Sequence, residues 1–236
     1  MPSPLQDEVS RYGVRLTDEQ DAQFDRYLAL LQQWSSRANL VGDASAETVR
    51  SRHFAESIAL GAALREREIL RPGARVIDVG AGAGFPGLPI AIVWPQVRLT
   101  LIDATRKKTD FLEAVVRELR VDADVRTGRA EDLAHEADLR EAFDLALARA
   151  VAPLPTLLEL TLPFVRAGGR LVTVKGSKAD DEVVMSRHAL DVLHARAFVV
   201  PFNVPGPPQR IVAVVKDAPT PAEYPRRPGV PAKSPL

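Results

Sequence analysis

The stretch Arg75-Val-Ile-Asp-Val-Gly80-Ala-Gly82-Ala-Gly84-Phe-Pro-Gly87 decides the fold expected for this chain. An apolar run that is typical of a buried strand leads into a glycine-rich turn, and Pro86 and Pro89 then favour the first turns of a helix. Glycine lets the backbone come close to a ligand, and the N–H groups of a helix N-terminus can meet the ligand's polar end. The stretch therefore predicts a strand–turn–helix unit that binds a ligand at the carboxyl edge of an open α/β sheet.

Outward from this stretch, short β-rich runs alternate with helical ones. Near-continuous apolar strands in such an alternation predict a parallel sheet covered on both faces. A proline-rich turn at residues 203–209, rather than a helix, joins the last two strands, which predicts an antiparallel pair at one edge. The seven expected strands are 75–79, 98–102, 124–127, 145–148, 170–174, 197–200 and 210–216. The helices expected between most of them are 89–93, 107–119, 154–165 and 180–194.

The two flanks of this alternating region differ from it in texture. Residues 1–70 contain two helical patterns, the first opened by a capping box at Thr17–Gln20 and the second running from about residue 48 to 66. Residues 218–236 are rich in proline, and composition alone predicts an extended tail without a packed core. We therefore expect an N-terminal helical extension (1–70), a central α/β domain (71–217) and a basic C-terminal tail (218–236).

Composition excludes several classes of function. Among 236 residues, 31 Lys and Arg balance 31 Asp and Glu, which argues against nucleic-acid binding by bulk charge but allows a local basic patch. The absence of cysteine excludes disulfides and thiolate chemistry, and the four histidines lack metal-ligand spacing, so no metal is expected. The N-terminus lacks the apolar core of a signal peptide, and no apolar run approaches the length of a membrane span, which predicts a cytoplasmic protein.

Two ligand classes compete for the glycine turn. Gly82-x-Gly84-x-x-Gly87 matches the dinucleotide fingerprint, whereas the same turn read from Asp78 matches the pattern of nucleoside methyl donors such as S-adenosylmethionine. Asp103 closes the next strand and suits the ribose hydroxyls of either ligand. A carboxylate at Asp78 would repel a pyrophosphate but suits the ammonium group of the methyl donor, and the antiparallel strand pair suits a methyltransferase sheet. We favour the methyl donor; a purely structural turn is the third reading.

Further motifs occur in order along nearly the whole chain. They are Trp34, Asn39-Leu40, Arg52–Ser57, Ile77–Ile92, Asp103–Lys108, Gly128–Glu131, Ala148–Ala150, Lys175-Gly176 and Tyr224–Pro231. In these segments the chain resembles the RsmG (GidB) family, bacterial methyltransferases that modify N7 of a guanine in 16S ribosomal RNA. The resemblance implies a Rossmann-like, seven-stranded class I methyltransferase sheet with helices on both faces. It also implies that S-adenosyl-L-methionine is the cofactor and that the small ribosomal subunit is the partner. We expect the chain to act as a monomer.

The resemblance also implies roles for individual residues. Glu131, with its neighbour Ala130, would lie near the adenine of the donor, and Arg149 would flank the site. Phe85 of the glycine turn would also contact the donor. Two of the expected donor contacts have structural alternatives, because Phe85 also suits a hydrophobic core and Glu131 also suits a helix cap. Together with the residues of the glycine motif, the set expected to bind the donor is Asp78, Gly80, Gly82, Gly84, Phe85, Asp103, Ala104, Thr105, Ala130, Glu131 and Arg149.

The chemistry implied by this substrate needs few catalytic groups. N7 of guanine carries a lone pair and no proton, so no general base is expected, and alignment of the reactants can contribute about 7–11 kcal/mol. Arg149 and Lys175 are the candidates for holding the base or its phosphate. The expected RNA contacts are Arg106, Lys107, Lys108 and Arg129, although residues 106–108 suit a solvated helix start equally well. Family members often carry an arginine before the last strand, and here Arg210 is shifted from that place by one residue. A one-residue shift in a strand reverses the face of the side chain, so Arg210 receives no role. Three alternatives stay open: a methyltransferase of another substrate, a nicotinamide-dependent oxidoreductase and a ribosome-binding module without activity.

Overall fold

The computed structural model describes residues 3–236, except for the side chains of residues 36 and 37. The chain divides into two compact units, each described here by itself. Unit 1 consists of the residues up to Ala74 together with Ala81–Thr127, and unit 2 consists of Arg75–Gly80 together with Gly128–Leu236. The domain boundaries expected near residues 70 and 217 stay a prediction.

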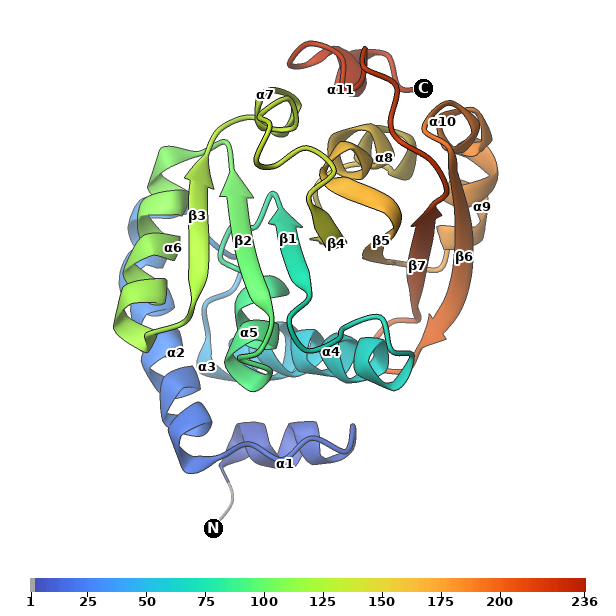
Figure 1. Ribbon diagram of the computed structural model, residues 1–236. Coiled ribbons are helices and arrows are strands. Elements are labelled where there is room, and N and C mark those ends of the chain that lie inside the picture. Colours follow the sequence, from blue (N-terminus) through green and yellow to red (C-terminus); the bar gives the residue numbers. More distant parts are fainter. Residues whose placement is uncertain (1–2) are drawn as a thin grey trace. The chain divides into compact units, whose positions relative to one another are not determined.

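Seven strands occur where the sequence predicts them, and they confirm the α/β class. Their order in the sheet is β3-β2-β1-β4-β5-β7-β6 (Figure 1). The strands are β1 (Arg75–Val79), β2 (Arg98–Asp103), β3 (Ala123–Thr127), β4 (Phe143–Ala148), β5 (Val165–Lys175), β6 (Ala195–Phe202) and β7 (Gln209–Lys216).

Unit 1 contains the parallel strand pair β2–β3, together with helices that precede and helices that follow the glycine turn in the sequence. The capping box at Thr17 and Gln20 opens the long helix α2 as expected, and α2 packs against α5 and α6. Instead of one continuous α-helix over residues 48–66, the chain forms a π-helical stretch at Val49–Ala55 before α4. The wider turn accommodates Val49 and Phe54 as fully buried side chains. The helices are α1 (Pro4–Ser10), α2 (Asp18–Ala38), α3 (Ala46–Thr48), α4 (Glu56–Glu66), α5 (Gly87–Val93) and α6 (Arg106–Leu119).

The core of unit 1 is an aromatic cluster that we define as Phe24, Tyr27, Phe54, Phe85 and Phe111, all of them buried. The ring centroids of Phe24 and Phe54 are 4.9 Å apart, and those of Tyr27 and Phe85 are 5.6 Å apart. Phe85 belongs to the glycine turn, whereas Phe24 and Tyr27 belong to α2. The N-terminal helices therefore pack directly against the turn that the sequence singles out.

Unit 2 contains the remaining five strands. β1 pairs in parallel with β4 and β4 with β5, whereas β7 runs antiparallel to both β5 and β6, which confirms the expected edge pair. The helix expected at 154–165 ends early, because a 3₁₀ turn at Leu162–Phe164 leads into β5. The helix expected at 180–194 breaks at Ser186, a buried residue whose hydroxyl donates to the Glu182 carbonyl at 2.7 Å. The helices of unit 2 are α7 (Ala130–Leu133), α8 (Leu154–Thr161), α9 (Ala179–Met185), α10 (Arg187–Val192) and α11 (Val230–Lys233).

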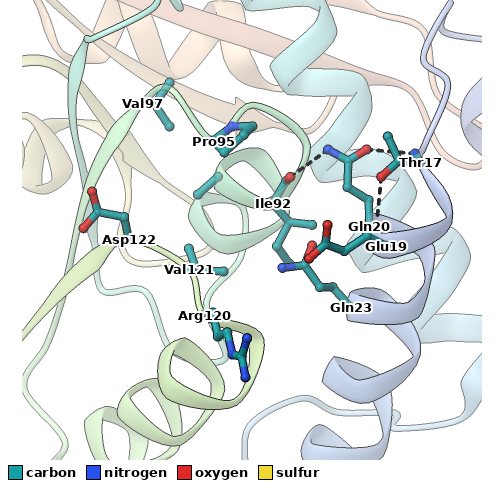
Figure 2. Close-up of a pocket in the computed structure, with 11 residues that line it drawn as sticks. Thr17, Glu19, Gln20, Gln23, Ile92, Pro95, Val97, Arg120, Val121 and Asp122 are labelled. Atoms are coloured by element: carbon teal, nitrogen blue, oxygen red, sulfur yellow. Dashed lines mark hydrogen bonds between the residues drawn. The ribbon is translucent and has the colours of Figure 1, made fainter.

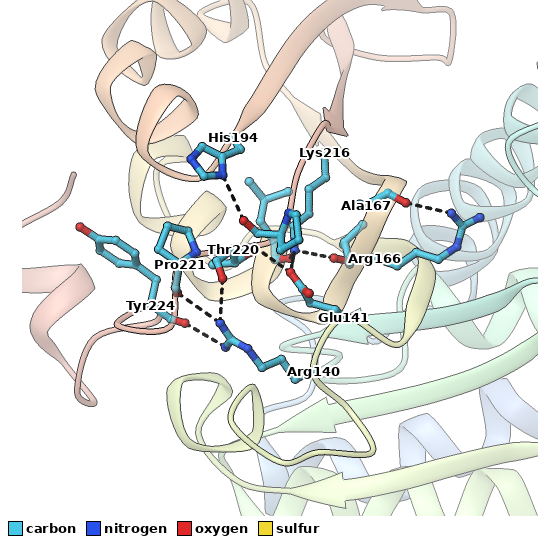
Figure 3. A network of polar contacts seen from close by, with 12 residues as sticks. Arg140, Glu141, Arg166, Ala167, His194, Lys216, Thr220, Pro221 and Tyr224 are labelled. Carbon is cyan, nitrogen blue, oxygen red and sulfur yellow. Dashed lines mark hydrogen bonds and ion pairs between the residues drawn. The ribbon is translucent and has the colours of Figure 1, made fainter.

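The C-terminal tail corrects a prediction. An extended segment without a packed core was expected from its composition, yet Pro225 and Pro231 are buried and the tail includes the short helix α11. Its first residues join a polar network in which Arg140 donates to three carbonyls of the tail, those of Thr220, Pro221 and Tyr224, at 2.9–3.2 Å (Figure 3). Composition could not reveal this packing, because the partners of the tail lie far away in the sequence.

Candidate cofactor site

The glycine turn begins in unit 2, at the carboxyl end of β1. Asp78 in β1 is fully buried. Gly80 follows with a φ of +71°, and a Cβ at this position would lie 2.8 Å from a methyl carbon of Val151. Both the left-handed backbone and the lack of space require glycine here. The loop after β4, which carries Arg149 and Val151, therefore packs directly onto the first residue of the turn.

In unit 1 the turn continues from Ala81 to Phe85 and rests on α2. Gly84 has a φ of +88°, and a Cβ there would lie 2.4 Å from Leu88 and 2.5 Å from the Tyr27 hydroxyl oxygen. The same hydroxyl donates a hydrogen bond to the Ala83 carbonyl. Tyr27 thus fixes the path of the turn, a role that sequence reasoning does not predict.

Asp103 ties the turn to the end of β2. Its Oδ2 accepts a hydrogen bond from the Gly82 N–H at 3.0 Å, and its Oδ1 accepts one from the Thr105 N–H at 2.8 Å. The side chain is 7% exposed, whereas Ala104 and Thr105 beside it are exposed. The carboxylate is therefore held rigidly next to the glycine turn, as the sequence predicts.

Phe85 belongs to the aromatic cluster. Its ring stacks on His53 at 4.9 Å between centroids, with 16° between the planes, and it is 6% exposed. These contacts bear out the core-packing alternative for Phe85, and its contact with a cofactor stays a prediction. The sequence alone does not single out His53 as a partner of the glycine turn. It lies within the motif Arg52–Ser57, and that motif is the signal that could have identified it.

In unit 2, Glu131 is buried in α7 and paired. Its Oε1 accepts a hydrogen bond from Arg129 Nη2 at 2.9 Å and another from the Gly229 N–H at 2.9 Å. Burial alone would raise the pKa of Glu131, but these two donors, together with its own backbone N–H, outweigh burial and hold the pKa below its ordinary value. Glu131 is therefore an ionised acceptor whose position depends on the C-terminal tail. Ala130, the first residue of α7, is half-buried.

Arg149 directly follows strand β4, and Lys175 is the last residue of its neighbour β5. Lys175 is only 13% exposed on its side chain, and its Nζ lies 2.9 Å from the Ala152 carbonyl oxygen and 2.9 Å from Glu182 Oε2. The lysine therefore secures the loop at 149–153, whose first residue, Arg149, is half-buried. Contact of Arg149 and Lys175 with the substrate stays a prediction. The sequence does not predict the contacts of Lys175 with Ala152 and Glu182.

The remaining basic candidates lie at helix starts. Arg106 and Lys107 are exposed in the first turn of α6, and Lys108 is half-buried. Arg106 forms an ion pair with Asp110 at 2.9 Å, and Arg129 remains about half exposed (52%) beside Glu131. These side chains can reach solvent, so phosphate contact is compatible with their exposure.

A cleft in unit 1 is separate from all of the expected site residues. It has a volume of about 280 Å³ and lies between the start of α2, the end of α5 and the segment at residues 120–122 (Figure 2). The Gln20 side chain crosses from α2 to donate to the Ile92 carbonyl at 2.9 Å.

Within residues 3–236 no group of three or more acidic or histidine side chains could hold a metal ion. In that same range no helix is both long and apolar enough to cross a membrane.

Comparison with known proteins identifies the family. The model of the GidB family, described as rRNA small subunit methyltransferase G, matches residues 20–210. The chain belongs to this family. A ribosomal RNA small subunit methyltransferase G from Roseiflexus castenholzii is 42% identical over 231 residues, covering 97% of each chain. Its counterpart from Streptococcus suis is 39% identical over 227 residues, covering 95% of this chain and 94% of the relative.

Solved structures support the same fold. A protein from Klebsiella pneumoniae assigned as an O-methyltransferase superposes with a TM-score of 0.58 at 16% identity, covering 92% of this chain and 97% of that one. The [4+2]-cyclase SpnF gives a TM-score of 0.56 at 16% identity, with coverage of 85% and 96%. Because identity is low, these likenesses concern the fold alone.

Membership of the family makes S-adenosyl-L-methionine the methyl donor. The residues present fit this donor. At Gly80 and Gly84 the left-handed backbone and the close packing of neighbouring side chains require glycine, so the turn keeps the path that the methyl-donor pattern needs. Asp103, held beside the turn, offers the acceptor that ribose hydroxyls require.

Proposed function

We propose that the chain transfers the methyl group of S-adenosylmethionine to N7 of one guanine in the 16S rRNA of the small ribosomal subunit. The observation that carries the proposal is the match to rRNA small subunit methyltransferases G over nearly the full length of both chains. The proposal places the chain in the bacterial cytoplasm and has it act as a monomer. For this reaction no residue of the described chain needs to bind a metal ion or to act as a covalent nucleophile.

The donor would be held by the glycine turn and by residues that each unit contributes. Asp103 would accept hydrogen bonds from the ribose hydroxyls, and the exposed Ala104 and Thr105 would border the same sugar. Asp78 would face the donor's ammonium group. The glycines at 80, 82 and 84 would form the turn that borders the donor, Phe85 would contact it, and Ala130 and Glu131 would lie near the adenine.

The chemistry is a direct displacement. The donor supplies an electrophilic methyl group on a sulfonium centre. As the N7–CH₃ bond forms from the N7 lone pair, the S–CH₃ bond breaks and its electron pair returns to sulfur, so the positive charge passes to the purine. No proton has to leave N7, and the chain's own contribution is therefore alignment, an effect worth about 7–11 kcal/mol in well-oriented reactions.

Alignment of the guanine is assigned to Arg149 and Lys175. The ammonium of Lys175 is engaged with the Ala152 carbonyl and with Glu182, so it can act on the substrate by keeping the loop at 149–153 in place. Arg149 at the start of that loop is then held ready to contact the base or its phosphate. Arg106, Lys107, Lys108 and Arg129 would bind flanking phosphates, which positions RNA without reading its sequence.

The test is a methyl-transfer assay with labelled S-adenosylmethionine. Purified protein is given intact small subunits, naked 16S rRNA or free nucleosides, and the labelled base is identified. We expect label on N7 of a single guanine. Label on a small metabolite but on no RNA would overturn the assignment of substrate, and thermal stabilisation by NAD but not by S-adenosylmethionine would overturn the assignment of cofactor.

A matched pair of variants tests the site. Asp103→Ala should weaken donor binding, because it removes both the acceptor and the anchor of the turn. Arg149→Ala should impair transfer while the donor still binds. Normal donor affinity in Asp103→Ala would show that the donor is held elsewhere.

A further inference from the structure

A segment of the C-terminal tail, residues 226–231, is fastened to α8 by a charge pair whose carboxylate is buried. Glu159 in α8 is fully buried. The backbone N–H and the Nε of Arg226 both donate to Glu159 Oε1, at 2.8 and 2.9 Å, and its Nη2 donates to Oε2 at 2.6 Å. One tail residue therefore supplies three hydrogen bonds to a carboxylate that is out of contact with water. Such a carboxylate is costly without its partner, so the pair fixes the tail firmly.

Two further hydrogen bonds fasten the same segment. The Thr156 hydroxyl of α8 donates to the Pro231 carbonyl at 3.1 Å, and the Gly229 N–H donates to Glu131 Oε1 in α7 at 2.9 Å. Gly229 has a φ of +82° and precedes α11. The tail thus bridges α8 and α7, and its contact with α7 is made by the carboxylate of Glu131.

The beginning of the tail is fixed as well. The ammonium of Lys216, at the end of β7, donates to Glu141 Oε1 at 2.6 Å, and the same oxygen accepts the Thr220 N–H at 2.7 Å (Figure 3). His194 Nδ1 lies 3.0 Å from the Pro219 carbonyl oxygen. Residues 217–231 are therefore anchored at both ends, and the Gly229 N–H is held in one place relative to α7.

Glu131 depends on this arrangement for its orientation. The side chain belongs to the four-residue helix α7, and its carboxylate accepts a hydrogen bond from its own backbone N–H. The two donors that Glu131 Oε1 accepts come from Arg129, which is half exposed, and from Gly229, which the tail holds in place. Of these two donors, only the Gly229 N–H belongs to a segment that is anchored elsewhere in unit 2, through Arg226 and Glu159. Loss of the tail contact would therefore remove the anchored donor and leave the half-exposed Arg129.

We propose that the tail segment 226–231 is a positioning element for the methyl donor, which orients Glu131 through the Gly229 N–H and is itself locked by the Arg226–Glu159 pair. This rests on the proposed function, which places Glu131 beside the donor's adenine. Arg226 is a positioning residue and has no contact with the reacting atoms. Its loss raises the KM for the donor, while kcat at saturating donor and the KM for ribosomal subunits stay unchanged.

The first experiment measures the dissociation constant of S-adenosylhomocysteine by calorimetry on the full chain. Loss of one oriented, charge-assisted hydrogen bond predicts binding about tenfold weaker in Arg226→Ala than in the wild type. Arg227→Ala is the matched control, because Arg227 is the adjacent exposed arginine, and its affinity should equal that of the wild type. Since Arg226→Ala leaves Glu159 buried without its partner, Glu159→Gln/Arg226→Gln is made as a second variant that removes both charges.

The second experiment is a double-mutant cycle with Glu131→Ala, measured in the same way. If the tail acts through Glu131, adding Arg226→Ala to Glu131→Ala weakens binding no further. Additive losses would overturn the proposal, because they would mean that the tail supports the fold in general. Wild-type affinity in both Arg226→Ala and the double glutamine variant, with Glu131→Ala weakened, would overturn it too.

One outcome separates this inference from the proposed function. Wild-type affinity in Glu131→Ala would remove Glu131 from the donor site and overturn both the residue assignment and the positioning role. Methyl transfer to 16S rRNA would then stand on its own assay. If Arg226→Ala fails to fold by circular dichroism, the double glutamine variant carries the cycle and the same criteria apply.

Discussion

In unit 1 the N-terminal helices are held by aromatic side chains, whereas in unit 2 the C-terminal tail is held largely by charged and polar groups. Phe24, Tyr27 and Phe54 pack together and against the glycine turn. The tail depends instead on Lys216 with Glu141 and on Arg226 with Glu159. Apolar packing tolerates small shifts, but a buried ion pair is strong only while both partners are present. The two terminal regions should therefore respond differently to mutation, pH and truncation.

The largest expected effect is in the aromatic cluster. Phe54 is fully buried, with its ring centroid 4.9 Å from that of Phe24 and 5.9 Å from that of Phe85. Phe54→Ala should lower the free energy of unfolding by about 3–5 kcal/mol, because it removes buried surface and leaves a cavity. Urea titration measures the loss. Phe198→Ala is the control, since that ring is 50% exposed, and an equal loss in both variants would contradict the role of the cluster.

The next effect concerns the ion pair at the start of the tail. Lys216 is fully buried, and its ammonium donates to Glu141 and to the carbonyls of Leu162 and Val165, the latter at 2.7 Å. Lys216→Met should cost about 2–4 kcal/mol of unfolding free energy, because it strands these acceptors.

Two further variants separate charge from packing at this position. Lys216→Met/Glu141→Gln should be less destabilised than Lys216→Met, because the second change removes the stranded carboxylate. Lys233→Met, at an exposed position of the same tail, should be close to the wild type. A double variant that is less stable than Lys216→Met would show that charge pairing is not what holds the tail.

Acid should affect the tail through Glu141. Burial raises the pKa of this carboxyl, but hydrogen bonds from Lys216 and the Thr220 N–H outweigh it, so the pKa lies below its ordinary value. A carboxyl with a lowered folded-state pKa adds stability that is complete above the unfolded pKa of about 4.3 and is lost as pH falls through the folded pKa. Glu141→Gln should therefore be about 1–2 kcal/mol less stable than the wild type at pH 7.

The same comparison gives the pH test. As pH falls from 7 toward about 3, the difference in unfolding free energy between Glu141→Gln and the wild type should narrow, since the wild-type carboxyl becomes neutral like the amide. Denaturant titrations at several pH values measure it. A difference that stays constant with pH would mean that Glu141 contributes by its shape and not by its charge.

The contrast between the two ends also explains what the sequence could reveal. Helical spacing of apolar residues and the capping box at Thr17 are local patterns, so α2 could be predicted. Asp103 and the glycine turn were predicted to lie together because the ends of neighbouring strands meet at one edge of a sheet. The partners of the tail are 67 residues away for Arg226 and 98 residues away for Gly229, and no local pattern connects them.

Some details of the site were beyond sequence reasoning for the same reason. A lysine that ends an apolar strand, like Lys175 or Lys216, is expected to face water, and only three-dimensional packing shows that both are largely buried. The break at Ser186 and the π-helical stretch before α4 depend on which side chains the surrounding core can accept. Propensity alone therefore predicted longer and more regular helices.

The smallest expected loss of unfolding free energy is at an exposed polar contact near the N-terminus. It tests whether the sensitivity of the tail to mutation comes from the polarity of its contacts or from their burial. Thr17 caps α2: its hydroxyl accepts the Gln20 N–H at 3.2 Å, and the Gln20 side chain accepts the Thr17 N–H at 3.0 Å, both in exposed positions. Thr17→Ala should cost about 1 kcal/mol, and Thr17→Ser, which keeps the hydroxyl, should cost clearly less. Thermal unfolding of the two variants measures the difference, and equal losses would mean that the methyl group matters more than the cap. A small loss here beside a large one in Lys216→Met would locate the sensitivity of the tail in its buried charges, because an exposed polar contact exchanges its partner for water and a buried one has no such substitute.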